Sequence, residues 1–238
     1  MKRIIVSAFI WISTSILIFI LFLAMLFFAI VLFPFDKQRK VAHAQCFWWA
    51  DAVIWLNPYW TIKVEGLENI DHNKTYVIVA NHLSLADIAV LYKTRMQFKW
   101  VAKESLFRIP VLGWCMSIGK HVRLKRGDFS SIKNIYREAA LWLRDGMSVL
   151  FFPEGTRSPN GKMQDFQNGA FKLAIKEKVP VLPISISGTA DAIPKGNWLF
   201  KTKVDISIRV MRPIETASLG PADFAILRDM ASKAIGSN

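Results

Sequence analysis

The chain carries a run of thirty residues, Ile4–Phe33, without a single charged side chain. About 20 predominantly apolar residues in a helix are enough to cross the hydrocarbon core of a bilayer. A secretory signal has an apolar core of only about 7–15 residues, and here the charged segment Asp36–Lys40 separates the run from the small-residue tripeptide Ala42–Ala44. We therefore predict a retained membrane helix. At about 45 Å it exceeds a hydrocarbon core of about 30 Å, so it must tilt, kink or re-enter.

A second apolar stretch, residues 47–60, contains four tryptophans and one tyrosine. Tryptophan and tyrosine concentrate at the membrane–water interface, so this composition favours a helix that dips into one leaflet. The alternative is a core helix of the domain that follows. We expect residues 1–60 to form a membrane anchor, with an apolar helix at 4–33 and an interfacial helix at 47–60. Residues 61–238 are expected to form the catalytic domain.

The formal net charge is +13, and nearly all of it follows the apolar run. Beside a membrane segment, this balance favours an anionic membrane surface and phosphate-bearing substrates as partners. Nucleic acid is not an expected partner, because no nucleic-acid-binding motif is present. The two cysteines, Cys46 and Cys115, form neither a disulfide framework nor a metal-binding spacing. Reduced cysteines are consistent with a domain that faces the cytoplasm.

From residue 61 onward, short runs of β-forming residues alternate with amphipathic segments, which predicts an α/β fold. The alternation in Val204–Met211 is typical of an edge strand, and Pro221 is expected to open the last helix. The expected strands are 61–65, 75–80, 98–102, 122–124, 148–152, 181–187 and 204–211. The expected helices are 85–93, 130–144, 170–177 and 221–235.

Polar motifs follow three of the expected strands directly. Asn81-His82 follows the first, Lys125-Arg126 the second and Pro153-Glu154-Gly155 the third. Residues just past the carboxyl ends of strands line the ligand crevice of α/β sheets. We therefore expect these three motifs to lie at one edge of the sheet.

His82 is the candidate general base, because an imidazole gains and loses a proton near neutral pH. Asp87, about one helical turn further on, is placed to accept the second ring N–H and fix the tautomer. A substrate hydroxyl can then be the nucleophile, as in acyl transfer from a thioester to an alcohol. Ser84 is a competing nucleophile, but no Gly-x-Ser-x-Gly surrounds it, and we expect it to be a helix N-cap. A metal site using His82, Asp87 and Glu154 is disfavoured, because the histidines lack ligand spacing.

Glu154 and Arg157 flank Gly155 in the turn after a buried strand. Arginine holds phosphate through two parallel hydrogen bonds, and glycine lets a ligand approach the backbone closely. The alternative is a solvated surface turn with a weak ion pair. Further basic residues are candidates to complete a phosphate pocket: Lys103, Lys125, Arg126 and Lys172. For Lys125-Arg126, a solvated turn stays equally open.

Three motifs together resemble successive blocks of the glycerophospholipid acyltransferases, and most of all the bacterial 1-acylglycerol-3-phosphate acyltransferases. The motifs are Asn81-His82-x-x-x-x-Asp87, Phe152-Pro153-Glu154-Gly155-Thr156-Arg157-Ser158 and Val179-Pro180-Val181-Leu182-Pro183-Ile184. The resemblance covers residues 61–211. It implies a glycerol-3-phosphate acyltransferase-like mixed sheet flanked by helices, with an N-terminal membrane-anchoring helical segment.

The resemblance also implies roles for single residues. His82 and Asp87 would be catalytic, while Glu154, Gly155, Thr156, Arg157 and Arg126 would bind the glycerol phosphate of lysophosphatidic acid. Lys103 is expected to join them because of its positive charge. The acyl donor would be acyl-CoA or acyl carrier protein, with no metal and no further cofactor. The protein would act at a bacterial-type cytoplasmic membrane, with its catalytic domain on the cytoplasmic side.

Two positions depart from the family pattern: Leu83 in the first motif, and Lys120, which precedes Arg126, the residue that matches the basic position of the family's second block. They leave other acceptors open, namely another lysophospholipid or a lyso-ornithine lipid. Two further hypotheses are a lysophospholipid hydrolase and a protein that binds anionic lipid without catalysis.

Overall fold

The computed structural model describes residues 2–57, 59–125, 129–193, 196–200 and 203–237. Their strands are β1 (Trp60–Glu65), β2 (Val77–Ala80), β3 (Phe98–Lys103), β4 (Val122–Leu124), β5 (Ser148–Phe151), β6 (Val181–Ser187) and β7 (Val204–Val210). The helices are α1 (Lys2–Val31), α2 (Lys40–Trp55), α3 (Ala86–Leu91), α4 (Leu112–Ile118), α5 (Phe129–Arg144), α6 (Gly169–Glu177), α7 (Thr189–Ala192) and α8 (Phe224–Gly236). Short 3₁₀ turns are η1 (Leu67–Asn69), η2 (Tyr92–Thr94) and η3 (Glu104–Arg108). Every expected strand, and every expected helix except the one at 47–60, is present within about three residues of its predicted bounds.

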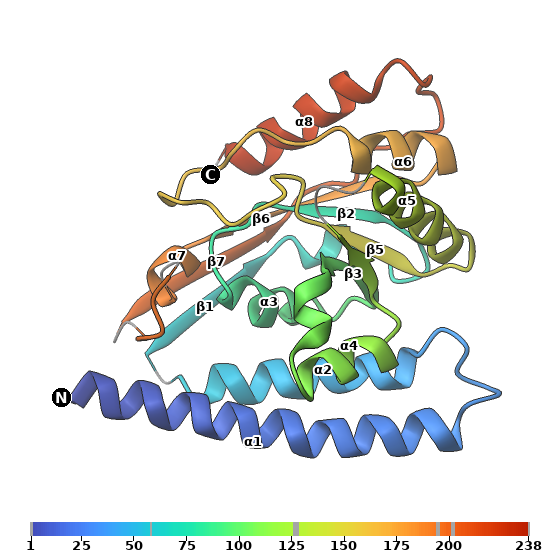
Figure 1. The fold of residues 1–238 in the computed structure, drawn as a ribbon. Coiled ribbons are helices and arrows are strands. Elements are labelled where there is room, and N and C mark those ends of the chain that lie inside the picture. Colours follow the sequence, from blue (N-terminus) through green and yellow to red (C-terminus); the bar gives the residue numbers. More distant parts are fainter. Residues whose placement is uncertain (1, 58, 126–128, 194–195, 201–202, 238) are drawn as a thin grey trace.

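The strands of the described residues form one mixed sheet of seven, in the order β1-β7-β6-β2-β5-β3-β4 (Figure 1). β6, β2, β5, β3 and β4 run parallel to one another, whereas β7 pairs antiparallel with β6 and parallel with β1. The carboxyl ends of β2, β5, β3 and β4 therefore lie at the same edge. The prediction that residues 204–211 form an edge strand was wrong, because β7 lies between β1 and β6.

Alternate residues of the central strands enter two separate cores. Ile78 and Ala80 pack on the side of α2 and α3, while Val77 and Val79 pack on the side of α5, α6 and α8. Successive side chains of a strand point to opposite faces, so a strand covered on both faces is apolar throughout. Figure 1 shows the resulting layers, with α5, α6 and α8 above the sheet and α1, α2 and α4 below it.

Helix α1 is long and apolar enough to cross a membrane, and most of its surface is exposed. Only four of its residues are buried, at the spacing of one helix face: Ser7, Ile10, Thr14 and Met25. The N-terminal half is tied to the loop before β7, where the Trp11 indole donates to the Trp198 carbonyl (2.8 Å) and the Phe200 amide donates to Ser7 Oγ (3.0 Å). One face of α1 thus docks on the domain, and the opposite face is a continuous apolar surface.

Helix α2 begins at Lys40, seven residues before the predicted start, and ends at Trp55. The Asp36 carboxylate accepts hydrogen bonds from the backbone N–H groups of Lys40 and Val41 (2.7 and 3.0 Å), which satisfies donors at the start of the helix. Ala50 and Val53 join the core of the sheet, whereas Trp48 and Trp55 are exposed. The helix therefore combines the core packing and the exposed aromatic surface that the sequence left as alternatives. The division into 1–60 and 61–238 stays a prediction about folding units.

Candidate active site

The loop that carries His82 is held at the end of β2 by Asn81. The Asn81 amide donates to the Ile186 carbonyl and accepts from the Ile186 N–H, both at 2.8 Å. Ile186 belongs to β6, which pairs with β2, so the loop continues the sheet through a buried side chain. His82 follows directly and keeps 15% of its side chain exposed.

The His82 ring is hydrogen-bonded to Asp87, with 2.7 Å between Nδ1 and Oδ2. The same carboxylate oxygen accepts from the backbone N–H groups of Leu83 (2.7 Å) and Ser84 (2.9 Å). Asp87 lies in the first turn of α3 and is fully buried, so these donors stabilise its negative charge. The pair orients the imidazole, leaves Nε2 as the nitrogen not taken by Asp87, and stabilises the ring when it gains a proton.

Glu154 joins the turn after β5 to the His82 loop. Its Oε1 accepts from the His82 backbone N–H (2.6 Å), and its Oε2 accepts from the Gln164 N–H (2.8 Å). The Ser158 N–H donates in return to the His82 carbonyl (2.8 Å). Burial raises the pKa of the Glu154 carboxyl, and the two N–H donors act against that shift. The two predicted motifs are therefore in direct contact, although they lie about seventy residues apart in the chain.

Gly155 has a φ of +73°, a conformation that side chains other than glycine rarely adopt. A Cβ added there would have no atom within 4 Å, so glycine is needed for the turn and not for close packing inside the protein. The Thr156 carbonyl accepts from the Gln164 side-chain amide at 3.5 Å, and Arg157 follows half-buried in the same turn. Gly155 is the exposed residue of this turn, and the open space beside it leaves room for a ligand to approach the backbone.

The other candidate residues are more scattered. Lys103 is exposed at the carboxyl end of β3, and Lys125 follows β4, which pairs with β3. Arg126 lies outside the described residues. The Lys172 ammonium on α6 lies 4.3 Å from the centre of the Phe224 ring. The structure thus brings His82, Asp87 and Glu154 together, and it places Lys103 at the same edge of the sheet.

Ser84 is fully buried, and its hydroxyl donates to the Ile193 carbonyl (2.9 Å). This burial disfavours the nucleophile hypothesis. The prediction that Ser84 is an N-cap was wrong by one residue, because Leu85 occupies that position. Ser84 Oγ nevertheless accepts from the Ala86 N–H (3.3 Å), so the serine helps to close the first turn of α3.

Phe152 is a residue of this site to which sequence reasoning assigned no role. Its ring stacks on the His82 imidazole, with 3.9 Å between centroids and 12° between planes. The signal in the sequence is the aromatic residue directly after β5 and before Pro153-Glu154. The identity of its partner is not a local property, because the contact depends on the pairing of β2 with β5.

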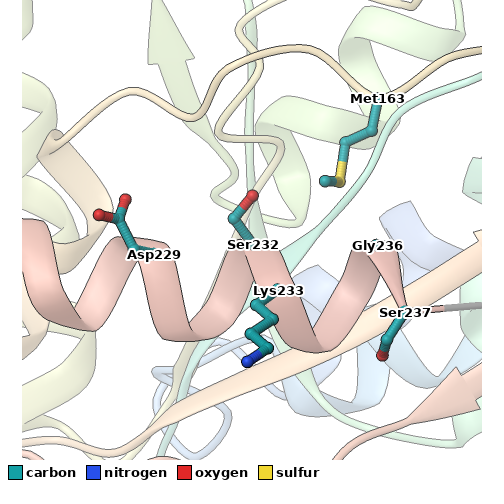
Figure 2. A pocket seen from close by; sticks show the side chains of 6 residues that line it. All are labelled: Met163, Asp229, Ser232, Lys233, Gly236 and Ser237. Carbon is teal, nitrogen blue, oxygen red and sulfur yellow. The ribbon is translucent and has the colours of Figure 1, made fainter.

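A hollow of about 510 Å³ lies elsewhere, between Met163 and the exposed side of α8 (Figure 2). Its lining includes Asp229, Ser232 and Lys233, and it contains none of the candidate residues. Within the described part of the chain, no group of three or more histidine, cysteine, aspartate or glutamate side chains is arranged to hold a metal ion.

The family model described as Acyltransferase matches residues 61–187, which include both motifs of the site. The match spans more than half of the chain, so this protein belongs to the acyltransferase family. The 1-acyl-sn-glycerol-3-phosphate acyltransferase BAT2 of Brassica napus is 37% identical over 182 residues, which cover 76% of this chain and 52% of the plant protein. The chain thus spans about half the length of that chloroplast relative.

Two bacterial proteins match over nearly the whole chain. The 1-acyl-sn-glycerol-3-phosphate acyltransferase of Pseudomonas aeruginosa is 29% identical, with 94% of this chain and 82% of that protein covered. The crystal structure of the LPA acyltransferase PlsC from Thermotoga maritima superposes with a TM-score of 0.82 at 26% identity. That likeness covers 99% of this chain and 95% of the other, so it includes α1 and α2 as well as the sheet.

Proposed function

We propose that this protein transfers an acyl chain from an acyl thioester to the free 2-hydroxyl of a 1-acylglycerol 3-phosphate, giving phosphatidic acid. The observation that carries the proposal is the His82–Asp87 pair, 2.7 Å apart, in contact with the Glu154 turn at the carboxyl edge of the sheet. The relatives that share this fold are named for the same reaction, which supports the choice of acceptor.

His82 takes the proton from the acceptor hydroxyl through Nε2, while Asp87 holds Nδ1–H and stabilises the imidazolium. The hydroxyl oxygen attacks the thioester carbonyl carbon, an ester C–O bond forms and the C–S bond breaks. The departing thiolate takes up the proton that His82 received and leaves as CoA or as acyl carrier protein. Transfer is direct, without an acyl-enzyme on Ser84 and without a metal or further cofactor.

The phosphate and glycerol are held by the turn after β5, through Glu154, Gly155, Thr156 and Arg157. Lys103 adds positive charge from the end of β3, and Arg126 is assigned the same role from the resemblance alone. An arginine pairs with a phosphate more strongly than a lysine, so Arg157 is the expected main contact.

The substrate reaches this site from a membrane surface. α1 presents its exposed face as a row of large apolar side chains that includes Phe9, Ile16, Leu23 and Ile30. Trp48 and Trp55 of α2 are also exposed. Because the opposite face of α1 is docked on the domain, we propose that both helices lie in one leaflet of a cytoplasmic membrane, with the catalytic domain on the cytoplasmic side.

The test is a matrix of lysolipid acceptors against acyl-CoA and acyl-carrier-protein donors, with products identified by mass spectrometry. We expect phosphatidic acid from lysophosphatidic acid, and a loss of at least about 100-fold in His82→Ala. His72→Ala is the matched control, because His72 is exposed in the loop before β2 and lies outside the site. Release of free fatty acid would indicate a hydrolase instead. Full activity of His82→Ala would rule out the proposed mechanism.

A further inference from the structure

Two contacts of different kinds define the orientation of the His82 ring. Asp87 contacts the edge of the ring through Nδ1, and Phe152 covers one face in a nearly parallel stack. The hydrogen bond to Asp87 alone would still allow the imidazole to tilt about the Nδ1···Oδ2 axis. A parallel aromatic surface at 3.9 Å restricts that rotation, because any tilt would separate the rings or make them clash.

Phe152 also packs against a second aromatic ring, that of Trp100. The Trp100 ring on β3 lies 5.7 Å away at an angle of 29°, and Trp100 is almost fully buried. The Trp100 indole N–H donates to the Tyr92 hydroxyl at 2.6 Å. Tyr92 contacts Phe47 and Trp49 of helix α2, at centroid distances of 5.9 and 6.4 Å. An unbroken series of aromatic rings therefore runs from α2 to the imidazole.

We propose that Phe152 is a positioning residue for His82, and that Trp100 and Tyr92 keep its ring against the imidazole. The proposal rests on the role assigned to His82 above. A general base acts only within hydrogen-bond reach of the proton, and a displacement of about 1 Å can cost about 100-fold in rate. The aromatic face also attracts a cation, so the stack favours the imidazolium that forms during the reaction.

The adjacent residue provides a matched control. Phe151 is the last residue of β5 and points to the opposite core, where it stacks on Tyr136 at 6.4 Å. The substitutions Phe152→Leu and Phe151→Leu remove the same atoms from consecutive positions. Only Phe152→Leu removes the surface that faces His82.

The experiment measures kcat, KM, the pH profile and thermal stability of the full-length chain in detergent micelles. We expect Phe152→Leu to lower kcat by about 10-fold to 100-fold, with KM for lysophosphatidic acid changed by less than about 3-fold. The acidic limb of the kcat–pH profile should differ from that of the wild type in Phe152→Leu, because the imidazolium loses its aromatic neighbour, and should match it in Phe151→Leu. Phe152→Tyr should retain kcat within about 3-fold, and Phe151→Leu should lose stability but little kcat.

A second readout does not depend on the acceptor. Diethyl pyrocarbonate modifies neutral imidazoles, and the rate at His82 can be followed by peptide mass spectrometry. We expect Phe152→Leu to accelerate modification of His82 several-fold, while Phe151→Leu leaves the rate unchanged. If the wild type acylates none of the lysolipids, the proposed function fails, and the modification rates alone decide the role of Phe152.

Three results would overturn the positioning role. The first is an equal loss of kcat in Phe152→Leu and Phe151→Leu at matched stability. The second is a rise in KM at constant kcat, which would make Phe152 a wall of the substrate site. The third is a modification rate at His82 that is the same in both variants.

Discussion

The surroundings of His82 and His43 differ in the two properties that decide whether an imidazole exchanges protons near neutral pH. His82 is partly exposed and hydrogen-bonded to the carboxylate of Asp87. His43 is fully buried among Phe47, Tyr92 and Phe98. Burial, assisted by the positive charge of Lys99, lowers the pKa of His43 to about 3. The same residue type thus lies partly exposed beside a carboxylate in one place, and is buried and kept neutral in the other.

Lys99 shows that the buried polar groups around His43 have a structural role. Its side chain is completely buried, and its ammonium donates to the carbonyls of Gln38 (2.6 Å) and Gly119 (2.8 Å). Burial lowers the pKa of Lys99 to about 8. The ammonium connects the turn between α1 and α2 to β3. A buried ionisable group with a perturbed pKa is therefore not sufficient by itself to identify a catalytic site.

The sharpest test of this comparison removes the Asp87 carboxylate from the His82 ring. Asp87→Asn cannot accept all three N–H donors and reverses the preference of the His82 tautomer, so we expect kcat to fall by about 10²-fold to 10⁴-fold. Asp51→Asn is the control, because Asp51 is paired with Lys93 and Arg95 at the surface. A kcat for Asp87→Asn within about 3-fold of the wild type would contradict the assignment.

A smaller effect is expected when the link between the two loops is weakened. Glu154→Gln replaces one acceptor oxygen by an NH₂ group that faces an N–H, so one buried donor loses its partner. We expect kcat to fall by about 10-fold to 100-fold, which corresponds to a cost of about 1–3 kcal/mol. Glu177→Gln, which disturbs only the Arg144 pair, should leave steady-state kinetics unchanged. Equal kinetics for the two variants would show that the loop contact is not needed for catalysis.

The buried imidazoles of His43 and His121 lead us to expect that the folded protein loses stability in acid. Burial lowers the pKa of His43 to about 3, and burial with nearby positive charge holds that of His121 well below its usual range. Below about pH 6.5 the unfolded chain binds protons that the folded chain does not, so stability falls as the pH falls. The two groups together cost up to about 2.7 kcal/mol per pH unit.

Equilibrium denaturation between pH 4.5 and pH 6.5 measures this slope, above the range in which most carboxylates titrate. In His43→Leu we expect the slope to decrease by about 1.4 kcal/mol per pH unit, while His72→Leu leaves it unchanged. An unaltered slope in His43→Leu would mean that this imidazole titrates in the folded state.

Local patterns were sufficient to predict the strands, because β2 and β5 are buried on both faces and therefore read as continuous apolar runs. The same reasoning misplaced β7. Its alternation arises because Val204, Ile206, Ile208 and Val210 enter one core while the opposite face is polar and less covered. Alternation reports that one face of a strand is covered, and it says nothing about which strands lie on either side.

The start of α2 was also missed. Lys40 and His43 are polar and therefore did not extend the apolar pattern. In the structure, the Asp36 carboxylate accepts from the Lys40 backbone N–H, and His43 is fully buried. A capping carboxylate and a docking surface both lie outside the apolar stretch from which the helix was predicted.

The sequence by itself determined the apolar helix, the alternation of strands and helices, and the His82–Asp87 pair, because each of these depends on neighbours within a few residues or one helical turn. Only the tertiary structure decided that Glu154 binds the His82 backbone, that Phe152 covers the imidazole and that α1 docks along one face. These contacts join segments far apart in the chain. The two contacts at His82 follow from the pairing of β2 with β5, which no local pattern encodes.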